Sequence, residues 1–191
     1  MTPQRLAVKF FTSPDPAAPV ELEQFIALFH EFIQSKRVDG LLIDVADYSH
    51  VPDGPGVILV GHDVEYGLDS AAGLAGLRAL GKRFEDASLD GALRETLRKA
   101  LGCIAAIEDD GRTGLRFDTA TVEIQLVDRL QAPHDEDVLR AALSEAAPTI
   151  DLLFGDAVLQ IPGDLDPRSL PTLSAVATEP ADLATLLTRL S

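Results

Sequence analysis

The residues of this chain whose types could support chemistry crowd into one stretch, Leu41 to Asp69. They are acids and imidazoles together with Tyr66, one of the two tyrosines of the stretch: Asp44, Asp47, His50, Asp53, His62, Asp63, Glu65, Tyr66 and Asp69. Carboxylate oxygens and imidazole nitrogens are ligands of zinc, manganese and iron, so one interpretation of this stretch is a metal site. Its candidate metal ligands are Asp44, Asp47, His50 and His62. The candidate catalytic residues of a metal-dependent hydrolase are Asp44, His50, His62 and Tyr66.

Alternation along residues 56–69 weighs against a single reactive centre. If this segment is one regular strand, successive side chains point to opposite faces. His62 and Tyr66 then share an apolar face, whereas Asp63 points the other way, so His62 and Asp63 do not bind one ion. The more conservative interpretation is that His62 and Tyr66 are partly buried and that neighbouring groups satisfy their polar atoms.

Asp44 interrupts an apolar strand predicted over residues 41–47, where Leu42 and Ala46 are expected on its face. A carboxylate in such a place needs a partner. We expect that partner to be His62 or Tyr66 on the next strand, a backbone donor, or a bound ligand.

The turn Pro52–Gly56 carries two prolines and two glycines, which hold a loop in a defined shape. One interpretation is an exposed hairpin connection between two strands. The other is a rigid loop that presents His50 to a small-molecule ligand near Pro52–Gly56.

The order of the elements predicts an α+β fold. In the first half, apolar patterns indicate strands over 6–12, 41–47 and 56–69 and helices from Val20 and over 89–108. Residues 71–83 suit either a strand or a helix, with a returning hairpin strand as the preferred interpretation. In the second half they indicate strands over 121–128, 157–161 and 170–177 and helices over 135–154 and 181–190.

The two halves share the order β-α-β-β, at an offset of about 115 residues. We therefore predict two β-α-β-β halves, a possible internal duplication, whose antiparallel or mixed sheet packs against helices. The halves would cover residues 1–110 and 111–191 and form one compact unit.

Composition limits the partners of the chain. Its 191 residues include 31 acids and 16 bases, a net charge of −15 that repels nucleic acid and anionic lipid surfaces. No apolar run is long enough to span a bilayer, and the N-terminal segment lacks the layout of a signal peptide. Cys103 is the only cysteine. We expect a cytoplasmic protein without nucleic-acid or membrane partners and without a cofactor.

The string DVADYSHVPDGPGVILVGH (residues 44–62), with VKFF near the start and VEIQLVDRLQAP later, resembles a family of uncharacterised bacterial proteins. The resemblance spans nearly the whole chain, and the central string is its most specific part. It implies no activity, cofactor or site residue. It does imply that residues 71–83 form a strand, although this chain carries an alanine- and glycine-rich version there.

No complete catalytic constellation stands in the sequence, so whether the protein is an enzyme stays open. The function that we expect is a non-catalytic binding or self-assembly module, present as a homodimer. A terminal amphipathic segment and apolar strands would suit self-association. The alternative is a metal-dependent hydrolase that uses the Asp and His residues of segment 44–63.

Overall fold

The computed structural model describes residues 2–13, 21–51, 54–70, 73–86, 88–128, 135–161 and 170–191. Eight strands and four helices lie in these ranges. The strands are β1 (Leu6–Phe11), β2 (Leu42–Tyr48), β3 (Gly56–Gly61), β4 (Val64–Asp69), β5 (Gly76–Gly81), β6 (Thr121–Leu126), β7 (Ala157–Gln160) and β8 (Thr172–Ala177). The helices are α1 (Gln24–Ser35), α2 (Leu89–Asp110), α3 (Glu136–Phe154) and α4 (Leu183–Arg189). The fold is therefore α+β, as the sequence predicts.

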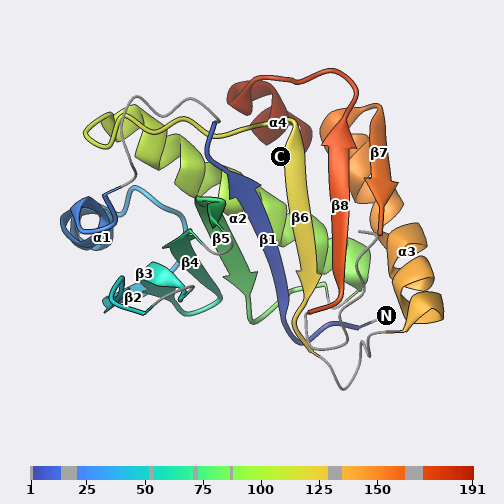
Figure 1. The fold of residues 1–191 in the computed structure, drawn as a ribbon, viewed down its shortest axis with the longest axis horizontal. Helices are drawn as coiled ribbons and strands as arrows, with labels where there is room; N and C mark the ends of the chain where they lie inside the picture. The colour runs from blue at the N-terminus through green and yellow to red at the C-terminus, as the bar shows by residue number, and fades with distance from the viewer. Residues whose placement is uncertain are drawn as a thin grey trace.

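All eight strands form one antiparallel sheet in the order β2-β3-β4-β5-β1-β6-β8-β7 (Figure 1). Each half starts with a central strand, crosses through a helix to an outer strand and returns by hairpins to pair beside its start. The second half is β6-α3-β7-β8, the predicted β-α-β-β. The first half carries two further strands, and the β1–β6 pair joins the halves. An internal duplication remains a prediction.

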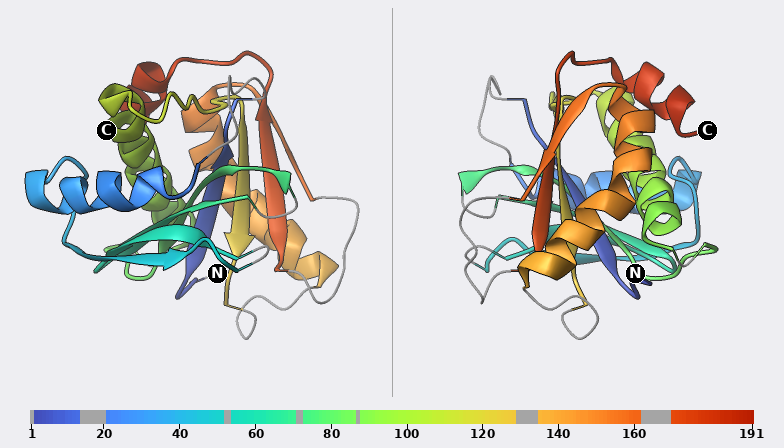
Figure 2. Two further views of the ribbon diagram at one scale, coloured as in Figure 1. Left: turned by 60° about the vertical axis from the view of Figure 1, so that its left-hand side comes forward. Right: turned by 90° about the vertical axis from the view of Figure 1, so that its right-hand side faces the viewer.

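The helices gather on one side of the sheet, as the edge-on view in Figure 2 shows for α2, α3 and α4. One apolar cluster fills the space between the two layers and includes side chains of both halves. The terminal helix α4 is part of this layer, because it packs on α2 and α3 and buries Leu186. No helix of the described residues covers the opposite side of the sheet, which we call the open face.

Helix ends follow local rules. Ser88 begins α2 by accepting a hydrogen bond from the backbone N–H of Gly91, and left-handed Gly111 ends it. The helix predicted from Val20 is α1, which begins at Gln24 and ends at Ser35, because Lys36 adopts the left-handed conformation at φ 55°. In the described residues, no helix is both long and apolar enough to cross a membrane.

The prediction of one long strand over residues 56–69 is wrong. It is a hairpin, β3 and β4, joined by a tight turn at His62 and Asp63. The two apolar runs look continuous in sequence because each strand alternates on its own side of the turn. Residues 76–81 form β5, antiparallel to β4, which confirms a strand within the ambiguous 71–83 segment. Ala71 and Ala72 lie outside the described residues.

Candidate functional site

Three charged side chains lie next to one another at the centre of the open face. In β1, Leu6, Val8 and Phe10 point toward the helices, so Lys9 points to the open face. The register places Lys9 opposite Arg78 of β5 on one side and opposite Glu123 of β6 on the other. Three neighbouring strands therefore present Arg78, Lys9 and Glu123 side by side, two cations followed by a carboxylate.

Lys9 forms a buried ion pair with Asp69. The Lys9 Nζ lies 2.6 Å from Asp69 Oδ1 and also donates to the Leu74 carbonyl oxygen at 2.8 Å. Both residues are only 5% exposed, which is unusual for charged groups on a sheet face without a helix over it. The ring of Phe11 lies 5.3 Å from the ammonium and adds a cation–π contact.

Arg78 and Glu123 flank this pair and are both half-buried. Burial lowers the pKa of Arg78, although the nearby Asp69 and Glu65 act in the opposite direction. The Arg78 Nε donates to Gln125 Oε1 at 3.0 Å, a neutral partner. Burial also raises the pKa of Glu123, which the charge of Lys9 offsets in part. Desolvation thus acts against the charged form of both groups.

These groups line a pocket of about 440 Å³, a size typical of small-molecule sites. Its wall consists of Lys9, Phe11, Gly54, Pro55, Asp69, Leu74, Arg78, Glu123, Gln125 and Leu170. We call it the open-face pocket. It combines convergent charged groups with the apolar residues Phe11, Pro55 and Leu74, and we therefore take it as the candidate ligand site.

Two glycines shape the open-face pocket. A Cβ on Gly76 would lie 2.8 Å from the Lys9 Cε and 2.5 Å from the Phe10 carbonyl oxygen, so glycine is required where the lysine side chain passes. A Cβ on Gly67 would lie 3.2 Å from the Pro55 carbonyl oxygen. The bare backbone at Gly67 therefore lets the 54–55 segment approach the sheet and form one wall.

Asp44 lies elsewhere, exposed on the edge strand β2. The expectation that it shares a face with Leu42 is wrong, because a bulge between Leu42 and Asp44 shifts the register by one residue. Leu42 then packs on the core, while Asp44 turns to the open face. Its carboxylate accepts a hydrogen bond from the Val45 backbone N–H at 2.8 Å, which is the backbone donor among the three expected partners.

His62 is not on the apolar face. It lies in the β3–β4 turn with its side chain 48% exposed, and its Nδ1 lies 2.7 Å from Asp63 Oδ1. This hydrogen bond lowers the pKa of Asp63. The argument that His62 and Asp63 point apart is therefore wrong, because it assumed a continuous strand. Tyr66, in contrast, is buried in the core at 1% exposure, and burial raises its pKa.

The predicted metal ligands are not brought together. His62 lies beside the start of β2, because its backbone N–H donates a hydrogen bond to the Leu41 carbonyl oxygen. His50, in contrast, follows the end of β2. Seven residues of strand separate them by about 20 Å. The Asp47 carboxylate instead accepts hydrogen bonds from the hydroxyl and the backbone N–H of Ser49, which lower its pKa. Among the residues that the structure describes, no three His, Cys, Asp or Glu side chains are grouped as metal ligands.

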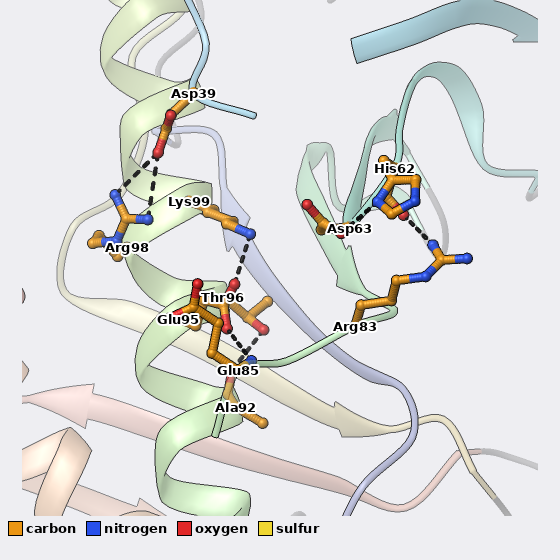
Figure 3. Close-up of polar contacts among 10 residues, drawn as sticks. All are labelled: Asp39, His62, Asp63, Arg83, Glu85, Ala92, Glu95, Thr96, Arg98 and Lys99. Atoms are coloured by element: carbon orange, nitrogen blue, oxygen red, sulfur yellow. Dashed lines mark hydrogen bonds and ion pairs between the residues drawn. The ribbon is translucent and has the colours of Figure 1, made fainter. Parts of the chain in front are cut away.

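A second hollow, of about 500 Å³, lies on the other side of the sheet between α2 and the β3–β4 turn. Two ion pairs lie on its wall, as Figure 3 shows. Arg98 lies 3.4 Å from Asp39, and Lys99 lies 2.7 Å from Glu95 on the same helix. Because these four charges are paired within the protein, they are less available to a ligand than Arg78 and Glu123 are.

The sequence analysis missed four residues of the open-face pocket, Lys9, Arg78, Glu123 and Gln125. Each is a polar position of an alternating strand, which in a single sequence looks like an ordinary solvent-facing residue. The only signal was a lysine inside the apolar run LAVKFF. Their convergence depends on the order β5-β1-β6, which brings together segments far apart in the chain.

Comparisons with known proteins give no relative. No protein-family model matches the chain, and no curated protein matches it significantly. The resemblance of the central string to uncharacterised bacterial proteins therefore remains a prediction, and the functional argument depends on the geometry of the chain itself.

Proposed function

We propose that this protein is a non-catalytic binding module that holds a small polar molecule in the open-face pocket. The observation that carries the proposal is the buried Lys9–Asp69 pair flanked by Arg78 and Glu123 in one pocket. Desolvated charges cost folding free energy, so a face of the sheet that needs only solubility would not be expected to collect them. A ligand that uses these groups explains their position.

The ligand site expected near the Pro52–Gly56 turn overlaps in part with the open-face pocket. Gly54 and Pro55 form one wall of the pocket, above Gly67. Pro52 and Asp53 lie outside the described residues. His50, the residue that this turn was expected to present, is exposed and is not part of the wall.

A thermal-shift screen of small polar metabolites tests the proposal. Leu74→Trp would obstruct the pocket without altering the sheet, because Leu74 is a rim residue with 56% exposure. The matched control is Leu152→Trp, an exposed leucine of α3 in the helix layer. We expect compounds that raise the Tm of the wild type and of Leu152→Trp but not that of Leu74→Trp. Shifts that persist in Leu74→Trp would place binding elsewhere.

The metal-dependent hydrolase remains the alternative. It would use some of Asp44, Asp47, His50 and His62, and the distance between the two histidines gives no support to a site that contains both. It predicts a higher Tm with added Zn²⁺ or Mn²⁺, and that this shift is lost in His62→Ala. Such a result would favour the hydrolase over the binding module.

A homodimer is part of the proposal, held by exposed apolar side chains around β2 rather than by strand pairing, which Asp44 and Asp47 oppose. Leu41, Ile43 and Tyr48 are each more than 40% exposed along this edge strand. The terminal helix, which was a second reason to expect self-association, packs within the chain instead. Sedimentation of the wild type and of Ile43→Glu at several concentrations tests the dimer, and a wild type that is monomeric throughout would exclude it. We also propose a cytoplasmic location, which the single buried cysteine, Cys103, suits.

A further inference from the structure

The open-face pocket holds two groups of opposite charge, Arg78 and Glu123, that form no ion pair with the residues that the structure describes. In the part of the chain that the structure describes, the Arg78 guanidinium makes one hydrogen bond, to the neutral amide of Gln125, and no ion pair within 4 Å. The Glu123 carboxylate makes neither a hydrogen bond nor an ion pair with those residues. Both side chains line the pocket.

The register fixes how far apart these two groups lie. Arg78 and Glu123 are each paired with Lys9, from opposite sides, so two strand spacings of about 5 Å separate their backbones. Between them the Lys9 ammonium is engaged by Asp69. The pocket therefore has a positive end over β5 and a negative end over β6, with a paired charge between the ends.

Each end matches one ligand group. The terminal nitrogens of a guanidinium form a planar fork that binds a carboxylate through two parallel hydrogen bonds. A carboxylate accepts hydrogen bonds from an ammonium group. A ligand with both groups would relieve the desolvation of Arg78 and Glu123 together, whereas a diacid would place a second anion beside Glu123 and a diamine would place a cation beside Arg78.

We propose that the ligand of this pocket is a zwitterion, a small molecule that places a carboxylate against Arg78 and an ammonium group against Glu123. This inference rests on the proposed binding function and adds the chemical class of the ligand.

Titration calorimetry with three matched compound series tests the inference. The series are ω-amino acids of three, five and seven carbons, the diacids of equal length and the diamines of equal length. At the best length, we expect the amino acid to bind the wild type at least roughly tenfold more tightly than its diacid or diamine.

Two variants that each remove one charge test which ligand group each end of the pocket binds. Arg78→Gln should lose binding of the amino acid, and Glu123→Gln should lose the preference for the amino acid over the diacid. A single cooperative unfolding transition without ligand serves as the control for folding. If the wild type binds a diacid or a diamine as tightly as the amino acid, the proposal of a zwitterionic ligand is wrong. If Leu74→Trp then loses the binding of that diacid or diamine, the pocket still binds a ligand and the proposed binding function stands. Failure of all three amino acids to bind also overturns the zwitterion, while the metabolite screen decides the binding function separately.

Discussion

The side chain of Lys9 passes over the bare backbone of Gly76. A methyl group at Gly76 would lie 2.8 Å from the Lys9 Cε and 2.5 Å from the Phe10 carbonyl oxygen, and a backbone oxygen cannot easily move inside a sheet. We expect Gly76→Ala to lower the free energy of unfolding by about 1–3 kcal/mol, through overpacking. Urea denaturation measures this change.

Gly102→Ala is the matched control. Gly102 lies inside α2, and a Cβ there would meet no atom within 4 Å. Alanine is the better helix residue, so this variant should gain about 0.5–1 kcal/mol. Equal effects of the two substitutions would contradict the close approach of Lys9 and Gly76.

The buried ion pair predicts a strong effect of removing its cation. Lys9→Met leaves the Asp69 carboxylate without its ammonium partner at 5% exposure, and we expect a loss of about 3 kcal/mol. The double variant Lys9→Met with Asp69→Asn should lose less than the sum of the two single variants, because the carboxylate that has lost the Lys9 ammonium is replaced by a neutral amide. Chemical denaturation of the four proteins in this cycle gives the coupling.

A second lysine pair offers the comparison. Lys82 Nζ lies 2.7 Å from Glu65 Oε1, with side chains 19% and 30% exposed. Because solvent screens this pair more, Lys82→Met should cost no more than about 1 kcal/mol. A cost for Lys9→Met as small as that for Lys82→Met would show that the buried pair contributes little.

Most of the fold could be predicted from the sequence, because its strands and helices have clear periods. The helix α2 and its cap at Ser88 follow from the spacing of leucines and a serine before them. The β3–β4 hairpin could not be predicted, since its turn at His62 and Asp63 contains neither glycine nor proline. The bulge in β2 could not be predicted either, because Leu42 and Ala46 fit the alternation of a regular strand.

The site was harder to predict than the fold. Asp69 stood among the acids of the central stretch, but its partner Lys9 lies 60 residues away in sequence. Nothing in a single sequence indicates that β1 inserts between β5 and β6. The crowding of Asp and His residues that suggested chemistry reflects two hairpin turns and a solvent-exposed edge strand.

The exposed aspartates of β2 predict an effect on aggregation rather than on stability. Asp44 and Asp47 lie on an edge strand, where charges oppose pairing with another chain. We expect Asp44→Val to alter the free energy of unfolding by no more than about 0.5 kcal/mol, yet to increase aggregation near the Tm. Light scattering during heating measures this, with Asp137→Val in the exposed first turn of α3 as the control. Equal aggregation of the two variants would contradict the protective role of Asp44.

Glu123 predicts a pH dependence with a definite sign. Burial, the largest cause, raises the pKa of its carboxyl above the ordinary value of 4.5. The folded protein therefore holds this proton more tightly than the unfolded chain does, so the contribution of Glu123 to stability falls as the pH rises above about 4.5 through the raised pKa. Glu123→Gln lacks this titration. Relative to the wild type it should gain stability between pH 4 and pH 7, by less than about 1 kcal/mol after solvent screening.

Asp182 provides a control of opposite sign. Its side chain accepts a hydrogen bond from the Thr185 N–H at the start of α4, which lowers its pKa below 3.8. The stabilisation from this carboxylate is complete above that value and is lost as the pH falls through the lowered pKa. Asp182→Ala should therefore cost more stability at pH 6 than at pH 3, while Glu123→Gln gains toward higher pH. If the difference between Glu123→Gln and the wild type is the same at pH 4 and pH 7, Glu123 is not desolvated in the folded protein.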